Sequence, residues 1–146
     1  MVDTVSVGGY CLMPNHYHLI VKSASEDALR RMMQSAMAAY GRYFNARYRR
    51  DGPLWRGRYR AKPLATREDL LRATAYVHLN HDDDPDYAWS AHRYMVREPA
   101  PEWLAADELA KAIGGATAYH RYIEIEIAAR KRKREIDTDA KPTRPG

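Results

Sequence analysis

The sequence predicts an α+β domain, because β-forming residues are concentrated near the N-terminus while helical periodicity dominates the rest. The clearest β-forming stretches are residues 5–10 and 16–21. With 146 residues the chain can form one compact domain and a tail. Its single cysteine, Cys11, excludes an internal disulfide and a multi-cysteine zinc site. No apolar run is long enough to span a bilayer, so we expect no membrane partner.

Two strands are predicted at the start of the chain. Val5 and Val7 alternate with small or polar residues, and residues 16–21 are mostly β formers, typical of a buried strand. Pro14 lies between the two stretches, and proline cannot donate to a strand ladder. A bend or turn is therefore expected between the strands.

A long helix is predicted next. Ser23 and Glu26 have the spacing of a capping box, and we expect the helix to run to about Arg49, before residues 51–53 end it. Its apolar residues recur at steps of three and four, as on one face of a helix. They are Leu29, Met33, Ala36, Tyr40 and Phe44.

A third strand is predicted over residues 54–64, where cations alternate with other residues. Period two places Arg56, Arg58, Arg60 and Lys62 on one face of such a strand. These four cations, the basic segment, repel one another unless an anion lies across them, which favours contact with nucleic-acid phosphates. An exposed edge strand kept soluble by charge is the alternative.

A second helix is predicted from Thr66, with Asp69 three residues on, to about Asn80. The remainder is predicted as a loop, two further helices and a tail without structure. The ranges are 87–103 for the loop, 104–113 and 117–134 for the helices, and 136–146 for the tail.

The charge of the chain is unevenly distributed around a net value of +5. Residues 30–62 hold ten Lys or Arg and one acid, whereas residues 66–102 hold four basic and eight acidic residues. Eleven Tyr and three Trp accompany a single Phe. Arginines with polar-tipped aromatics suit nucleic-acid binding through phosphate contacts and base stacking, and a solvated basic surface is the alternative.

Two pairs of residues carry candidate chemistry. His16 and His18 project from one face of a strand, where two imidazoles can bind one metal ion, the alternative being a partly buried pair without a metal. Tyr76 and Asn80 share a helical face, where a tyrosine can act as nucleophile and an amide oxygen can bind a metal. A packed aromatic and a helix-terminal residue are the alternative. With the basic segment, the two pairs indicate phosphodiester chemistry.

Three stretches, residues 9–21, 43–60 and 69–80, resemble the REP-associated tyrosine transposases, the single-tyrosine branch of the HUH endonucleases. In the HUH motif U is a hydrophobic residue, and Tyr17 stands at that position. Residues 87–90 look like the family's Tyr/Trp-Ser-Ser segment more loosely.

The resemblance implies a fold, a reaction and a site. The implied fold is a ferredoxin-like antiparallel sheet with helices on one face. His16, His18 and Asn80 match the ligands of Mg²⁺ or Mn²⁺, and Tyr76 matches the tyrosine that attacks DNA and becomes joined to a 5′-phosphate. Such enzymes nick and rejoin single-stranded DNA beside REP-like hairpins during DNA transposition and recombination. The branch is bacterial and cytoplasmic, and its members are monomers or homodimers.

The chain departs from the family pattern at its start, after Asn80, and in its basic and variable C-terminal tail. The family usually carries a strand and a helix before the stretch at residues 5–10, so an N-terminally truncated catalytic domain is expected over residues 1–100. A helical C-terminal extension over residues 101–135 and the tail follow. Asn80 also precedes an acidic run, residues 82–84, which should weaken DNA binding unless it points away or binds a metal.

Two other functions compete with the enzyme. A catalytically impaired or domesticated relative would bind hairpin DNA without cutting it. A small metal-binding protein without a DNA role is the third reading, against which the basic segment argues.

Overall fold

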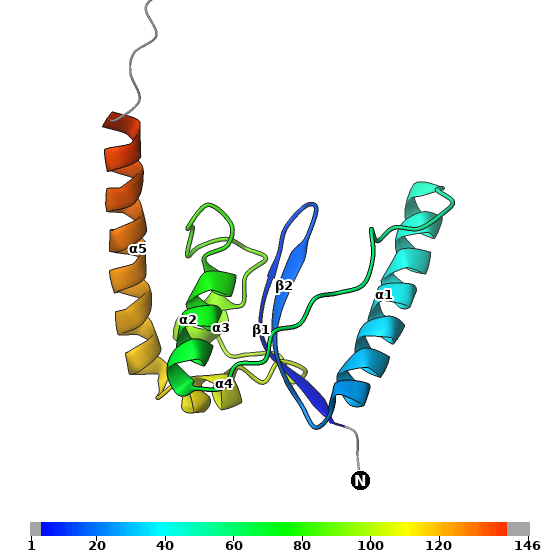
Figure 1. The fold of residues 1–146 in the computed structure, drawn as a ribbon, viewed down its shortest axis with the longest axis horizontal. Coiled ribbons are helices and arrows are strands. Elements are labelled where there is room, and N and C mark those ends of the chain that lie inside the picture. Colours follow the sequence, from blue (N-terminus) through cyan, green and yellow to red (C-terminus); the bar gives the residue numbers. More distant parts are fainter. Residues whose placement is uncertain (1–3, 140–146) are drawn as a thin grey trace, which may run out of the picture. The chain divides into compact units, whose positions relative to one another are not determined.

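The computed structural model describes residues 4–139 and confirms the α+β class (Figure 1). Its residues form two compact units, unit 1 with residues 4–6 and 21–63, and unit 2 with residues 7–20 and 64–139. No helix within residues 4–139 is long and apolar enough to cross a membrane. The elements in chain order are β1 (Val5–Leu12), β2 (Tyr17–Ser23), α1 (Glu26–Tyr48), α2 (Arg67–His78), α3 (His92–Val96), α4 (Ala106–Ala112) and α5 (Ala116–Asp139).

The two predicted N-terminal strands pair as an antiparallel hairpin, β1–β2. The turn predicted at Pro14 joins them, and the Met13 amide donates to the His16 carbonyl at 2.9 Å. Beside this hairpin, isolated bridges link Cys11 to Ser90 and Val7 to Leu104. The sheet of the described residues thus has two strands, fewer than a ferredoxin-like sheet contains.

The strand predicted over residues 54–64 is wrong, because this stretch of unit 1 is irregular. Period two describes a strand only where a neighbouring edge supplies ladder hydrogen bonds, and the described sheet holds β1 and β2 alone. The start of this stretch and the loop before it are hydrogen-bonded to α1 instead. Trp55 Nε1 donates to the Met37 carbonyl at 2.9 Å, and Asn45 Nδ2 donates to the Gly52 carbonyl at 2.9 Å.

Helix α1 begins two residues later than the predicted capping box implies. Ser25 is the N-cap, and its hydroxyl accepts from the Ala28 amide at 3.1 Å. Ser23 instead donates its hydroxyl to the Ser25 carbonyl at 2.7 Å, outside the helix. The C-terminus agrees with the prediction, since Arg49 adopts a left-handed conformation (φ 51°) that ends the helix.

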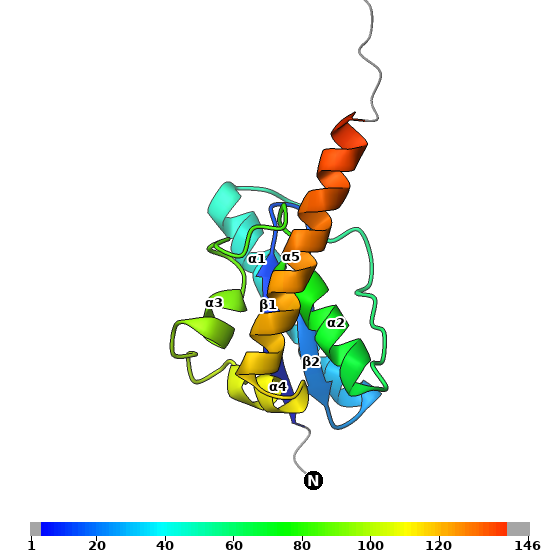
Figure 2. The ribbon, with the colours of Figure 1, turned by 90° about the vertical axis from the view of Figure 1, so that its left-hand side faces the viewer.

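In unit 2 the helices α2, α3, α4 and α5 gather on one side of the hairpin (Figures 1 and 2). Helix α2 begins as predicted, with the Thr66 hydroxyl accepting from the Asp69 amide at 3.0 Å. Helix α4 agrees with its prediction and is followed by Gly114 and Gly115 at positive φ. A short helix, α3, interrupts the segment predicted as loop.

The C-terminal helix α5 belongs to the same core as the strands. Tyr119 and Ile123 are buried in one apolar cluster with Tyr10 and Cys11 of β1. The helix passes through the Ile-Glu-Ile-Glu-Ile alternation of residues 123–127, burying Ile123 and exposing Ile125. It reaches Asp139, so the start of the predicted tail is helical, and residues 140–146 lie outside the described residues.

Candidate active site

The two histidines of the HxH pair lie side by side in unit 2. His16 ends the hairpin turn and His18 follows in β2, and their ring centroids are 5.4 Å apart at an interplanar angle of 90°. His16 is exposed and His18 is half-buried. The side chains therefore form a neighbouring pair of imidazoles at one end of the hairpin.

Tyr76 of α2 lies next to this pair. Its ring meets the edge of the His18 ring with centroids 5.6 Å apart and an interplanar angle of 76°. About half of Tyr76 (52%) is exposed, so its side chain is accessible from solvent. The structure thus brings together His16, His18 and Tyr76, although they are separated by some sixty residues of chain.

Asn80 does not lie on the helical face of Tyr76 that its i, i+4 spacing predicts. Helix α2 ends at His78 with Leu79 as the C-cap, so Asn80 lies in the following turn and not on the helical face of Tyr76. Its amide donates to the Val77 carbonyl at 3.3 Å, and its side chain is half-buried. The turn that follows places Asp82 and Asp83 at positive φ, which cannot continue a right-handed helix.

The basic segment lies in unit 1, in the irregular stretch that follows α1. Arg56, Arg58, Arg60 and Lys62 are all exposed. Trp55 and Tyr59, which alternate with them, are half-buried. Gly57 and Ala61 are exposed like the cations, so exposure does not alternate along the stretch, but all four cations are accessible to an anion.

The two histidines fit a divalent cation. The Nδ1–H of His16 donates to Asn15 Oδ1 at 2.6 Å, which leaves the lone pair on Nε2. Burial, and secondarily the charge of His16, lower the pKa of His18, which favours the neutral imidazole that a metal requires. Within residues 4–139, no three His, Cys, Asp or Glu side chains cluster as a metal site. Further ligands would have to be oxygen atoms of other kinds, such as the Asn80 amide.

A buried polar network, which the sequence pattern does not reveal, lies behind Tyr76. His78 of α2, His92 of α3 and Tyr119 of α5 are all buried. The Tyr119 hydroxyl lies 2.6 Å from His78 Nδ1 and 2.7 Å from His92 Nδ1, so it donates to one ring and accepts from the other. Burial lowers the pKa of His78 to about 3, and the charge of His92 acts in the same direction.

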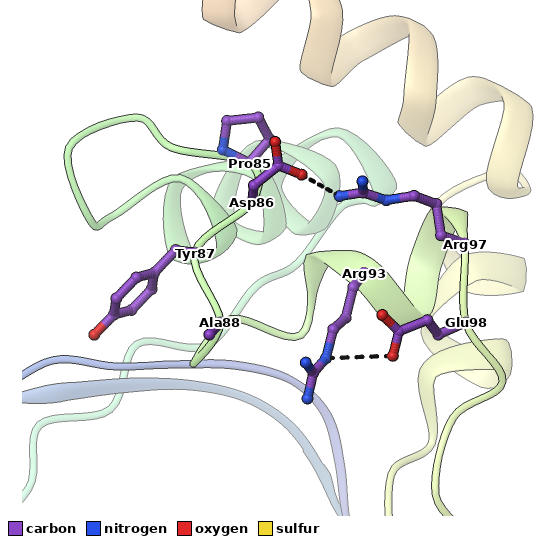
Figure 3. Close-up of a pocket in the computed structure, with 7 residues that line it drawn as sticks. All are labelled: Pro85, Asp86, Tyr87, Ala88, Arg93, Arg97 and Glu98. Atoms are coloured by element: carbon purple, nitrogen blue, oxygen red, sulfur yellow. Dashed lines mark hydrogen bonds and ion pairs between the residues drawn. The ribbon is translucent and has the colours of Figure 1, made fainter.

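A separate pocket of about 240 Å³ lies elsewhere in unit 2 (Figure 3). It includes Arg93 and Arg97 among its lining residues. Arg97 pairs with Asp86, and Arg93 lies 3.7 Å from Glu98. These arginines are already paired with carboxylates, and Tyr76 and the two histidines do not line the pocket. The pocket is therefore distinct from the candidate site.

Comparison with protein families gives the identity of the domain. Residues 3–80, more than half of the chain, match the family described as IS200-like transposases, so the chain belongs to this family. The matched range contains the hairpin, α1, α2 and all the candidate residues described above. Membership indicates DNA binding and DNA transposition. No curated protein and no solved structure gave a significant match.

Proposed function

We propose that this chain nicks and rejoins single-stranded DNA beside hairpins through a covalent link to Tyr76, as a REP-associated tyrosine transposase of the HUH type. The observation that carries the proposal is the contact of Tyr76 with His18, whose ring in turn neighbours His16. An exposed phenol beside two imidazoles, in a transposase family, matches tyrosine-mediated strand cleavage.

His16, His18 and Asn80 would hold Mg²⁺ or Mn²⁺. Such an ion supplies Lewis-acid stabilisation of the charge that develops on the phosphate oxygens. The Asn15 carboxamide orients the His16 ring by accepting its Nδ1 proton. The two imidazoles favour Mn²⁺ more than Mg²⁺, because nitrogen ligands bind the softer of the two ions better.

The reaction is a transesterification that conserves the number of phosphodiester bonds. The Tyr76 oxygen attacks phosphorus, the bond from phosphorus to the 3′-oxygen breaks, and the tyrosine proton is balanced by the proton gained at the released 3′-hydroxyl. The product is a 5′-phosphotyrosine, which a 3′-hydroxyl of another strand attacks in the reverse sense to rejoin DNA. No external energy source is required. The basic segment binds backbone phosphates of the substrate.

A cleavage assay tests the proposal directly. Labelled single-stranded hairpin DNA is incubated with protein and Mn²⁺, then resolved on a denaturing gel. Wild type is expected to give a covalent protein–DNA band, and Tyr76→Phe is expected to give none. Tyr43→Phe is the matched control, because it removes the same hydroxyl from an exposed tyrosine of α1.

Three outcomes separate the possibilities. A band that requires both Mn²⁺ and Tyr76 supports the proposal. Tight hairpin binding by folded wild-type protein without any band would favour the hairpin-binding relative that does not cut. A band that persists in Tyr76→Phe would show that another residue is the nucleophile and would overturn the assignment.

A further inference from the structure

The turn that follows α2 has a backbone that requires support. Asp82 and Asp83 are consecutive residues at positive φ, 52° and 55°. Two adjacent non-glycine residues in this region are unfavourable unless their surroundings hold them. Backbone hydrogen bonds from Asp83 to the Leu79 carbonyl (3.2 Å) and from Asp84 to the His81 carbonyl (2.9 Å) close the turn locally. Asn80 lies within it.

Helix α5 supplies support from one side. Arg130 Nη1 lies 2.6 Å from one carboxylate oxygen of Asp83, and Arg134 pairs with the other. Arg130 also donates through Nε to Glu126 at 2.8 Å. The Asp83 side chain is only 19% exposed, so these pairs are shielded from water more than surface pairs are. Figure 2 shows α5 running along the molecule in front of α2 and the hairpin.

The same turn is also linked to β1, through His81 and Tyr87. The His81 ring stacks on the Tyr87 ring with centroids 3.8 Å apart and an angle of 3°. The Tyr87 hydroxyl donates to the carbonyl of Leu12, the last residue of β1, at 2.7 Å. The turn is therefore fixed at His81 and at Asp83, on the residues that come directly after Asn80.

We propose that Arg130 and Arg134 are positioning residues of the cleavage site, which hold Asp83 and so place Asn80 for metal binding. This inference rests on the proposed function above. It assigns a role to the acidic run of residues 82–84, since Asp83 faces α5 and both of its carboxylate oxygens are engaged there. The pairs also cancel a negative charge that would otherwise stand beside bound DNA.

The test compares Arg130→Gln/Arg134→Gln with Arg132→Gln/Lys133→Gln. The control removes two exposed cations from the same stretch of α5 without touching Asp83. The first measurement is Mn²⁺ affinity of DNA-free protein, from the electron paramagnetic resonance signal of free Mn²⁺. The second is hydrogen exchange at the amides of Asp83 and Asp84. The third is binding of hairpin DNA without metal.

The positioning variant is expected to bind Mn²⁺ about tenfold more weakly and to exchange these amides faster, whereas the control matches wild type in both. Added to Asp83→Asn, the two arginine substitutions should have little further effect, because the pairs are already broken. Arg130→Lys/Arg134→Lys keeps the charges and is expected to recover most of the affinity.

Several results would overturn the inference. Unchanged Mn²⁺ affinity and amide exchange in the positioning variant would do so, as would equal losses in the control. Weaker hairpin binding with unchanged Mn²⁺ affinity would show instead that Arg130 and Arg134 contact DNA phosphates. If wild type still forms the covalent Tyr76–DNA adduct, these results reject only the positioning role of Arg130 and Arg134, and the proposed function stands. Failure of wild type to bind Mn²⁺ or form the adduct removes the proposed function and the inference together.

Discussion

Tyr76 and His78 stand two positions apart on α2 and have opposite surroundings. Tyr76 is 52% exposed, whereas His78 is fully buried and hydrogen-bonded to Tyr119. Two positions of an α-helix correspond to about 200° of rotation, so the two side chains point in nearly opposite directions. Anchoring His78 in the core fixes the rotation of α2 and thereby presents Tyr76 to solvent beside His18.

Gly9 packs so closely against His78 that a side chain at this position would clash with the ring. A Cβ at Gly9 would lie 2.8 Å from His78 Nε2 and 3.3 Å from Leu109 Cδ2. The buried ring has no room to retreat, so we expect Gly9→Ala to lower the free energy of unfolding by about 1–3 kcal/mol. Urea unfolding measures the change. Gly57→Ala is the control, because nothing lies within 4 Å of its added Cβ. Equal unfolding midpoints for the two variants would contradict this reading.

At the scale of elements, four exposed cations gather in a segment without regular structure. The cations of the basic segment remain exposed although the strand predicted for them does not form. Phosphate contacts require accessible cations on a tethered backbone, not a sheet. Trp55 tethers the segment by donating to the Met37 carbonyl of α1, and unit 1 ends at Pro63, directly after Lys62. DNA binding is therefore expected to depend on the charge of the segment.

Replacing all four cations of the basic segment by glutamine should weaken hairpin binding and its salt dependence together. If each cation contacts one phosphate of a single strand, the slope of log K against log salt falls in magnitude by about 3. Fluorescence anisotropy across a salt series measures the slope. A triple glutamine variant at Lys131, Arg132 and Lys133 is the comparison. A slope unchanged in the first variant would show that the segment does not touch the backbone.

The elements also show how far sequence reasoning reaches. The hairpin, the N-cap of α2 and the end of α1 were predictable, because proline, threonine and an apolar periodicity act through neighbouring residues. Two serines, Ser23 and Ser25, precede the first helix, and the capping-box spacing favours Ser23 as the N-cap. The hydrogen bonds in the structure show that Ser25 is the N-cap. The prediction of a strand over residues 54–64 is wrong because a strand must pair with the edge of a sheet formed by other residues, which a local pattern does not reveal. The proximity of His16, His18 and Tyr76 was expected from family resemblance, not from spacing.

At the scale of the molecule, the His78–Tyr119–His92 network joins three helices that are distant in sequence. Neither its members nor their contacts follow from a local pattern, since the Tyr119 hydroxyl meets residues 27 and 41 positions away. The charge pairs of Asp83 with α5 are of the same kind. The helices after residue 80 thereby become part of the core that supports Tyr76.

The network predicts sensitivity to acid. Burial, and secondarily the charge of Arg97, lower the pKa of His92 to about 4 from an ordinary value of 6.5. The unfolded chain binds this proton near pH 6.5 and the folded chain does not, so stability is full above pH 6.5 and falls as the pH drops towards 4. The loss is at most about 1.4 kcal/mol per pH unit from this group.

Urea unfolding at a series of pH values between 7 and 4.5 measures that slope. His92→Asn is expected to be less stable at pH 7 and to lose stability less steeply on acidification. Tyr43→Phe, which removes a hydroxyl from an exposed residue of α1, should keep the wild-type slope. An unchanged slope in His92→Asn would place the acid sensitivity elsewhere.

The ion pairs of Asp83 have a consequence for how this protein can change over evolution. The stretch that matches the transposase family ends at Asn80, and Asp83 is anchored some fifty residues further on. A chimera that joined residues 3–80 to a foreign C-terminal half would keep Tyr76, His16 and His18 but lose the ion pairs between Asp83 and α5. Because a charge change at position 83 leaves Arg130 and Arg134 without their partner, we expect substitutions at these three positions to occur together among relatives.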